Sequence, residues 1–350
     1  MKTVLVINPG STSTKIAEAH DGRIVRSETI VHNGSIAAKA APLWDQLPER
    51  LARCRPWIGE SLQLCDAVVS VGGLLRPLPG GTYRVSKRML ADAKAGVQGQ
   101  HASNLGCAMA EIIAGEFGCP AFVVDPVSVD EFEPVAYYSG HPKIRRRSLS
   151  HAVSLHAAAR RAAASVGKPL EDSSFVIAHL GGGISVAAVR AGRIIDVNDA
   201  ASDGPFSPER TGGLPLQEFI TLCYAEGMKE TEARSLVMGK GGLVAYLGTN
   251  SVADAESQAA EGNEESRGVL EAMAYQIAKE IGAMSTVLEG NVDAVVLTGG
   301  VARSAFVTSA VGQRVRSIGT VLLYPGDDEM TALAEGATRV LEGTETALEY

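Results

Sequence analysis

The chain has 350 residues, of which 45% are hydrophobic, and its formal net charge at pH 7 is −8. This length is more than one ordinary core requires and predicts two domains. The acidic balance argues against nucleic acid as the main partner, although an anionic small molecule needs only a local positive site. The conspicuous basic run is Lys143, Arg145, Arg146 and Arg147, for which a solvated loop is the simplest interpretation.

The five cysteines, at positions 54, 65, 107, 119 and 223, show no C-x-x-C pairing. This usage is typical of a reduced cytoplasmic protein with ordinary buried thiols. No apolar run is as long as a membrane span, and Asn8-Pro9-Gly10 would interrupt the hydrophobic region of a signal peptide. We therefore expect a cytoplasmic protein that has no membrane partner.

Short apolar runs alternate with segments of helical periodicity along the chain. Buried strands are predicted at 4–7, 67–71, 121–124, 175–178, 292–297 and 320–323. Helices are predicted at 103–117, 150–166, 215–225, 268–288 and about 331–341, the last of them returning to the first domain. One face of the fourth helix is apolar: Val269, Met273, Ile277, Ile281, Met284 and Leu288. Alternating strands and helices predict an α/β protein.

Two segments of the chain echo each other. The segment INPGSTSTKIAEAHDGRIV near the N-terminus returns as AHLGGGISVAAVRAGRII in the second half, with the same separation from Asn8 to Gly22 as from Ala178 to Gly192. Each reads as a strand, a turn of small residues, a second strand and then Gly-Arg-Ile. Two hairpins of one design predict two related domains. Chance similarity is the alternative, since both segments reverse through common hairpin turns.

Three turns of small residues follow apolar strands. Around Ser11 and Ser13 the backbone N–H groups can approach an anion, the hydroxyls add donors, and Lys15 adds a positive charge. This pattern indicates phosphate, although the second glycine of a Walker A loop is absent; a polar hairpin tip is the alternative. The other two turns contain Gly181-Gly182-Gly183 and Gly299-Gly300. The last could hold a nucleotide at a helix start or be a plain strand-to-helix turn.

Seven motifs resemble the acetate kinase family, and within it the butyrate kinase branch. They are NPGSTSTK, GQHASNLG, VVDPVSVDE, HLGGGIS, DGPFSPERTGGLP, GKGGLVAYLGT and VDAVVLTGG. The resemblance runs from about residue 1 to residue 350. It implies the fold of sugar kinases, Hsp70 and actin, with two duplicated actin-like (ribonuclease H-like) α/β domains and a central interdomain cleft. The implied domains are 1–148 with 331–350, on the carboxylate side, and 149–330, on the nucleotide side.

The resemblance also implies a reaction. ATP and a short-chain fatty acid, butyrate or a branched relative such as isobutyrate, would give ADP and an acyl phosphate, reversibly and by direct in-line transfer with Mg²⁺. It further implies a homodimer or a larger homo-oligomer. Acetate or propionate is the alternative substrate. A nucleotide-binding regulatory protein that keeps the fold but has lost phosphoryl transfer is the alternative from another class.

The resemblance implies roles for particular residues. Arg210 matches the arginine that acts on the transferring phosphoryl group, for which a planar guanidinium is suited; an interdomain salt bridge is its alternative role. His151 and His179 match histidines near the phosphoryl path, where each can donate without acting as acid or base. Asp125, with either Asp328 or Glu329, matches the carboxylates on the metal side.

The remaining implied residues line the two substrates. Those for ATP are Asn8, Ser11, Ser13 and Lys15 in the first turn, Gly181, Gly182 and Gly183 in the second, Gly299 and Gly300 in the third, and Gly241 and Gly242 near the adenine. Those for the carboxylate are His101, Asn104, Gly72 and Gly73. Ser103 is also well placed to cap the helix that follows it, which is the alternative role of this loop.

One position departs from the butyrate kinase pattern. Members of that branch usually carry an arginine where this chain has Val71. A valine cannot pair with an anion, so Arg76 or another cation takes over, the site accepts a different acid, or activity is reduced. Gly182 stands where acetate kinases carry an asparagine, and its presence favours the butyrate branch.

Overall fold

The structure is a computed structural model that describes residues 1–32, 42–61, 64–326 and 329–350. The chain divides into two compact units, Met1–Asp130 with Asp328–Tyr350 (unit 1) and Glu131–Asp327 (unit 2). The first boundary therefore lies at residue 130 and not at 148. The segment after residue 130 belongs with unit 2 because Arg146 donates to both oxygens of Asp196, at 2.8 and 3.1 Å, and Glu133 N–H donates to the Ile195 carbonyl.

Unit 1 is built on a six-stranded sheet in the order β3-β2-β1-β4-β6-β5. Its strands are β1 (Thr3–Pro9), β2 (Ser13–His20), β3 (Arg23–Val31), β4 (Ala67–Val71), β5 (Thr82–Arg84) and β6 (Ala121–Val124). Strands β1, β4 and β6 are parallel, whereas β2, β3 and β5 run antiparallel to their neighbours. Every residue of β4 and β6 is buried, which explains why these two apolar runs predict strands with the observed bounds.

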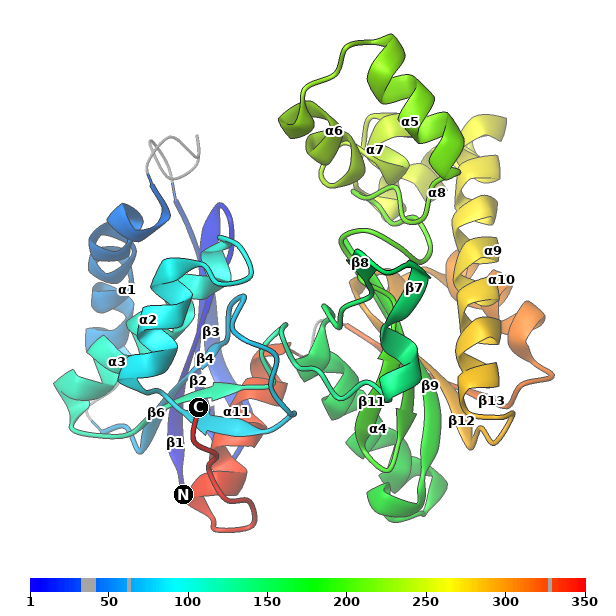
Figure 1. Cartoon of the computed structure of the whole chain (residues 1–350). Coiled ribbons are helices and arrows are strands. Elements are labelled where there is room, and N and C mark those ends of the chain that lie inside the picture. Colours follow the sequence, from blue (N-terminus) through cyan, green and yellow to red (C-terminus); the bar gives the residue numbers. More distant parts are fainter. Residues whose placement is uncertain (33–41, 62–63, 327–328) are drawn as a thin grey trace. The chain divides into compact units, whose positions relative to one another are not determined.

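Helices cover both faces of this sheet. They are α1 (Leu47–Ser61), α2 (Lys87–Ala95), α3 (Gly106–Phe117) and α11 (Glu329–Leu341). Helix α3 packs on β4 and β6, and α11, the last helix of the chain, packs on β1, β4 and β6. Figure 1 shows α1, α2 and α3 on one side of the sheet and α11 on the other. The C-terminal helix thus returns to unit 1, as the sequence predicted.

Unit 2 is built on a five-stranded sheet in the order β11-β10-β9-β12-β13. Its strands are β9 (Ser174–Leu180), β10 (Ile184–Arg190), β11 (Arg193–Val197), β12 (Ala294–Gly299) and β13 (Thr320–Pro325), with a separate hairpin of β7 (Tyr138–His141) and β8 (Ile144–Arg145). Strand β13 is the edge of the sheet and is partly exposed. The predicted strand at 320–323 is therefore present, but the prediction that it is buried is wrong. An edge strand has a neighbour on one side only.

The helices of unit 2 are α4 (Ala152–Val166), α5 (Leu216–Ala225), α6 (Glu230–Val237), α7 (Gly242–Leu247), α8 (Val252–Ala260), α9 (Glu264–Val287) and α10 (Ala305–Val315). Helix α4 packs on β9 and β12, and α9 packs on β9 and β10. The apolar face predicted for α9 is confirmed, since all six of its residues belong to the buried core. Helices α5 and α6 extend away from the sheet (Figure 1).

The two hairpins that echo each other in sequence are equivalent in structure. In both, a central strand (β2 or β10) pairs antiparallel with a strand on each side. The second of these pairings contains a bulge, between Glu18 and Ala19 in β2 and between Ala188 and Val189 in β10. The turns that follow, at Asp21-Gly22 and Ala191-Gly192, have positive φ at all four residues. Matching registers and bulges confirm the predicted duplication, because chance similarity of two hairpins does not reproduce a bulge at the same position.

The duplication fixes where each unit can carry a site. Strands β1, β4 and β6 are parallel, and so are β9, β12 and β13. In each unit the carboxyl ends of three strands therefore meet at one edge of the sheet, which is where open α/β sheets bind ligands. The residues that follow these ends are those that the sequence singled out.

Candidate functional site

The hydroxyl-rich turn of unit 1 joins β1 to β2. Gly10 N–H donates to the Ser13 carbonyl at 2.8 Å and closes the turn. Asn8 and Lys15 are register partners across the two strands, so their side chains lie on one face. Ser11 is exposed, and Ser13 is partly buried. The turn therefore presents hydroxyls, an amide and an ammonium group in one small region.

Asp125 follows β6 at the same edge of the sheet. Its side chain is 1% exposed, and its Oδ1 accepts from Gly81 N–H at 2.7 Å. Its φ of +39° is positive, as are those of Asp21, Ala191 and Glu289. Of these four residues Asp125 alone is a buried residue. A strained, buried carboxylate at a strand end is typical of a functional site.

Glu329 begins α11 and contacts the first turn. Its Oε2 accepts from Asn8 Nδ2 at 2.6 Å. Asp328, the alternative metal-side residue, lies outside the described residues. Within the described part of the chain, no three His, Cys, Asp or Glu side chains are placed to hold a metal together. One or two carboxylates suit Mg²⁺, which keeps several waters and binds substrate phosphates, so the donor set of Asp125 and Glu329 fits that ion.

Of the two glycines after β4, Gly73 packs against Asn104 and Gly72 packs against Val123 and Pro126. A Cβ on Gly73 would lie 2.5 Å from Asn104 Cα, and one on Gly72 would lie 2.6 Å from Val123 Cγ1. Asn104 is fully buried, accepts from Leu74 N–H and donates to two carbonyls, those of Ala93 and Gly99. Its amide therefore fixes the glycine turn by binding backbone groups.

His101 caps the short helix that precedes α3. Its Nδ1 lies 2.9 Å from Ser103 Oγ and accepts from Ser103 N–H at 3.3 Å. The loop therefore carries a helix cap, as the alternative role predicted. The capping acceptor is the His101 side chain, however, and Ser103 contributes the backbone N–H that donates to it. The His101 residue is exposed, which leaves the ring able to reach a ligand.

Val71 ends β4 and is 3% exposed. Arg76, the nearest candidate to replace the missing arginine, donates from Nε and Nη2 to Asp92 at 2.7 and 3.0 Å. Asp92 also accepts from the Tyr350 hydroxyl at 3.0 Å. Two of the Arg76 nitrogens are therefore committed to an ion pair, and this pair holds the pKa of the Asp92 carboxyl below its usual range.

In unit 2 the predicted histidines are in contact. The rings of His151 and His179 stack with centroids 4.3 Å apart and an interplanar angle of 23°. His151 Nδ1 lies 2.9 Å from Ser185 Oγ, which follows the glycine turn. Burial, followed by the neighbouring His179 and Arg210, lowers the pKa of His151 well below its usual value. The His151 ring is therefore neutral at physiological pH.

Arg210 reaches the same cluster. Its Nη1 donates to the Ala200 carbonyl at 2.6 Å. A Cβ on Gly183 would lie 2.5 Å from Arg210 Cζ, so the guanidinium lies directly against the glycine turn. Burial lowers the pKa of Arg210, while Glu209 and Asp199 act in the opposite direction; the guanidinium stays charged. The structure thus brings Arg210, His151 and His179 together around one turn.

Of the predicted glycines in unit 2, Gly241, Gly242 and Gly299 pack closely against backbone, whereas a Cβ on Gly300 would meet nothing within 4 Å. A Cβ on Gly299 would lie 2.9 Å from the Leu180 carbonyl carbon, and one on Gly242 would lie 2.9 Å from that of Ser207. Both have positive φ, +92° and +61°. Gly181 approaches the His179 ring, Gly182 approaches Glu209, Gly241 approaches Thr211, and Gly300 begins a short helix after β12. The closely packed glycines allow backbone segments to approach each other at the sheet edge.

Sequence reasoning missed several residues that hold these turns. Ser207 Oγ donates to the Gly182 carbonyl at 2.6 Å, and Glu209 N–H donates to the same carbonyl at 3.3 Å. Both residues lie in the motif that carries Arg210, which was the available signal. Arg50, on α1, binds the first turn, and nothing in the local sequence around it indicates this. The basic run is also more than a solvated loop, since Arg146 pairs with Asp196 and Arg147 with Asp199.

A profile of the acetokinase family matches residues 133–346. A probable butyrate kinase of Listeria innocua is 47% identical over 99% of both chains. Butyrate kinase 2 of Clostridium acetobutylicum is 45% identical over 99% of both chains.

Solved structures of low sequence identity share the fold. An acetate kinase of Porphyromonas gingivalis superimposes with a TM-score of 0.80 at 18% identity, covering 97% of this chain and 99% of that one. A propionate kinase of Francisella tularensis gives 0.74 at 18% identity, with 96% and 99% covered. These matches confirm the predicted fold class of sugar kinases, Hsp70 and actin. With a family profile over more than half of its length and curated relatives matched along almost all of it, the chain belongs to the acetokinase family.

Proposed function

We propose that this protein transfers the γ-phosphoryl group of ATP to a short-chain carboxylate, butyrate or a branched relative such as isobutyrate, and forms ADP and an acyl phosphate. The names of the relatives and the family support this activity. The observation that carries the proposal is the cluster of Arg210, His151 and His179 against the glycine turn of unit 2. A cationic, donor-rich cluster at a strand edge is what a moving phosphoryl group requires.

The chemistry needs no general base. A carboxylate oxygen attacks the γ-phosphorus, the new P–O bond forms, and the bond to the β,γ-bridging oxygen breaks, with its electron pair leaving on ADP. The acid is already ionised at neutral pH, so no proton moves. What the protein must supply is alignment of two anions and balance of the charge on the transferring group.

Arg210 would supply that balance. Its guanidinium can donate to two equatorial oxygens at once. His151, which is neutral, and His179 would donate to phosphate oxygens through ring nitrogens, while Ser185 fixes the orientation of the His151 ring. Residues of this kind act by positioning and electrostatics, and a charged donor of the Arg210 type is worth about 10³–10⁵ in rate.

The turns of each unit, taken separately, offer groups that would bind a phosphate of ATP. Ser11, Ser13 and Lys15 offer donors and charge in unit 1, and Gly181, Gly182, Gly183, Gly299 and Gly300 offer backbone approach in unit 2. Asp125 and Glu329 would hold Mg²⁺, which supplies charge neutralisation of the β- and γ-phosphates when bound. Gly241 and Gly242 would lie on the nucleotide side.

The carboxylic acid would lie near Gly72, Gly73 and His101. Asn104 is buried and bound to backbone, so we propose that it shapes this turn and does not touch the acid. Val71 makes the end of β4 apolar, which suits an alkyl chain; each further buried CH₂ contributes about 0.8 kcal/mol. With Arg76 bound to Asp92, the carboxylate would be met by other donors.

A hydroxamate assay tests the proposal. Acetate, propionate, butyrate and isobutyrate are each offered with Mg-ATP, and the acyl phosphate is trapped with hydroxylamine. We expect the highest kcat/KM with butyrate or isobutyrate. Highest activity with acetate or propionate would overturn the substrate assignment. Tight ATP binding without product from any acid would contradict the activity. It would favour the second candidate function, a nucleotide-binding regulatory protein, which is supported by Val71 in place of the usual arginine.

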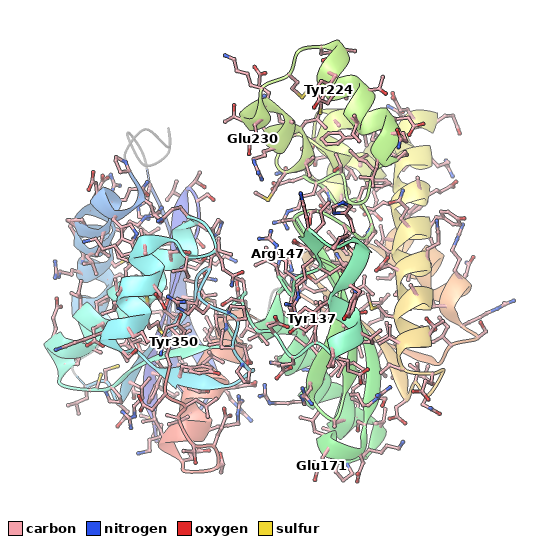
Figure 2. The ribbon with its side chains drawn as sticks, viewed as in Figure 1. Tyr137, Arg147, Glu171, Tyr224, Glu230 and Tyr350 are labelled. Atoms are coloured by element: carbon pink, nitrogen blue, oxygen red, sulfur yellow. The ribbon has the colours of Figure 1, made fainter. Side chains whose placement is uncertain are left out.

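We also propose that the protein is a homo-oligomer that assembles through α5 and α6, an arm in which every residue is exposed or partly exposed. Leu216 is 72% and Tyr224 85% exposed, and Ile220, one helical turn after Leu216, is also exposed. Figure 2 shows Tyr224 and Glu230 on this arm, away from the sheet of unit 2. An apolar face on an unsupported helix pair is stable when it is covered, and a second copy covers it with the same face under two-fold symmetry.

Light scattering after gel filtration tests the assembly. The double variant Leu216→Glu, Ile220→Glu is expected to shift the mass to that of one chain, whereas Thr221→Glu, an exposed position on the same helix, is expected to leave it unchanged. A wild-type mass of one chain would refute the assembly.

A further inference from the structure

A buried arginine lies behind the hydroxyl-rich turn of unit 1. Arg50 is in the first turn of α1, and its side chain is 0% exposed. It is among the largest fully buried side chains in the described part of the chain. Arg50 lies outside NPGSTSTK, the sequence motif that contains the first turn.

The guanidinium of Arg50 binds the turn through its inner carbonyls. Its Nη1 donates to the Gly10 carbonyl at 3.0 Å and to the Ser13 carbonyl at 3.3 Å, and its Nη2 donates to the Ser11 carbonyl at 3.4 Å. Nη1 also donates to Thr14 Oγ1 at 3.2 Å. Three carbonyls of one short turn therefore point at one side chain.

That arrangement orients the other side of the turn. In a trans peptide the C=O and the following N–H point in opposite directions. The carbonyls of Gly10 and Ser11 point at Arg50, so the N–H groups of Ser11 and Thr12 point away from it. Outward N–H groups in succession form an anion-binding surface.

Arg50 forms no ion pair with a carboxylate among the described residues, although the charge of the preceding residue, Glu49, acts on it. The remaining partner of Arg50 is Gln46, whose Oε1 accepts from Nη2 at 3.0 Å and from Nε at 3.3 Å. A buried cation without an ion pair is unfavourable for folding, and a positive charge in the first turn of a helix is unfavourable as well. Stability alone does not explain this residue.

His32 supports the same turn and adds no charge. The ring Nε2 of His32 lies 2.8 Å from Thr14 Oγ1, and the backbone N–H of His32 donates to the Thr12 carbonyl at 2.9 Å. Burial, followed by Arg50 and Arg53, lowers the pKa of His32 to about 4. The ring is neutral at pH 7, so Arg50 carries the positive charge behind the turn.

We infer that Arg50 is a positioning residue for phosphate binding: it holds the Gly10–Thr14 turn open to an anion and places behind it a positive charge that forms no ion pair. The inference rests on the proposed function, because the anion would be the phosphate tail of ATP.

Calorimetric titration with ATP, tripolyphosphate and adenosine tests the role of Arg50. Arg50→Gln removes the charge, and Arg50→Lys keeps it without the planar fork. Arg53→Gln is the matched control, since Arg53 lies three residues along the same helix, is exposed and pairs with Glu49. Loss of charge-assisted bonds predicts roughly 10- to 100-fold weaker binding of ATP and tripolyphosphate in Arg50→Gln. Arg50→Lys should be intermediate, Arg53→Gln should match the wild type, and adenosine affinity should change less than about two-fold in all variants.

Wild-type-like affinity for tripolyphosphate in folded Arg50→Gln would overturn the inference, and so would an equal loss of adenosine binding. Hydrogen exchange on the wild type provides a measurement that needs no variant. Tripolyphosphate should slow exchange in the peptides that contain Ser11 and Thr12, and unchanged exchange there would also overturn the inference. Failure of the proposed function is seen separately, as wild type that binds ATP and yields no hydroxamate.

Discussion

The imidazole rings of His151 and His179 stack at 4.3 Å between centroids, at the carboxyl edge of the unit 2 sheet. Two imidazolium ions at this separation would repel each other, and Arg210 adds a further positive charge. The structure therefore favours a neutral His151 that donates a hydrogen bond over a His151 that exchanges a proton. The pKa of His151 is lowered by burial and then by its two neighbours, in agreement with this role.

The first prediction follows from that neutrality. Because His151 stays neutral above its lowered pKa, the rate of acyl phosphate formation should show no limb due to His151 between about pH 6.5 and 8.5. His151→Asn keeps a donor and should lower kcat without changing the shape of the pH profile. A limb near pH 7 that disappears in His151→Asn would contradict the neutral role. Initial rates across this range give the answer.

Arg210→Ala should fold and lose nearly all turnover. The guanidinium is the cation of the cluster, and loss of such a group reduces kcat by about 10³–10⁵. Arg234→Ala removes an exposed arginine that pairs with Glu230 and should leave kcat within about two-fold, as surface ion pairs contribute little. Near-ultraviolet circular dichroism checks folding. Near-normal kcat in folded Arg210→Ala would remove Arg210 from the reaction.

Adjacent glycines provide a matched pair of variants. A Cβ on Gly183 would overlap the Arg210 guanidinium, whereas a Cβ on Gly182 would meet Glu209 Oε2 at an ordinary 3.5 Å. The Arg210 side chain can move aside, so Gly183→Ala should fold with little loss of thermal stability. Its kcat should fall about 10²-fold, because displacement of a catalytic group by about 1 Å has that effect. Gly182→Ala leaves Arg210 in place and should lose less activity than Gly183→Ala, and equal activity of the two variants would contradict this geometry.

Removal of the divalent ion should abolish activity. With Asp125 as a ligand, Asp125→Asn should shift the Mg²⁺ concentration for half-maximal rate upward by at least tenfold, the effect of roughly 1.4 kcal/mol. Asparagine tolerates the positive φ found at this position, so the backbone is kept. Asp45→Asn, an exposed carboxylate of the same unit, is the control. An unchanged Mg²⁺ dependence in Asp125→Asn would exclude this carboxylate as a ligand.

His32 makes stability depend on pH. Its pKa is about 4 in the folded chain and 6.5 when unperturbed. Between these values the unfolded chain binds more protons, so the free energy of unfolding falls as pH drops from 6.5 towards 4. The loss attributable to His32 is on the order of 1–3 kcal/mol. Urea unfolding at pH 7 and pH 5 should show a smaller loss in His32→Asn than in the wild type; an equal loss would refute the assignment.

Local features of the sequence were sufficient for much of the fold. The strands at 67–71 and 121–124 are apolar on both faces because both lie inside a parallel sheet, and such runs are recognisable without structural information. The duplicated hairpins are recognisable because a bulge and a positive-φ turn constrain the same residues in both copies. The start of α9 was missed by four residues, since its first turn is polar and is set by the Asn263 cap.

The sequence by itself determined the α/β class, the duplication and the turns that carry glycine, hydroxyl and lysine side chains, because these depend on short-range periodicity and backbone conformation. Only the tertiary structure decided which residues meet. The stacking of His151 on His179, the burial of Asn104 and the position of Arg50 behind the first turn join segments far apart in the chain. Such contacts are set by packing of whole elements, and no local pattern encodes them.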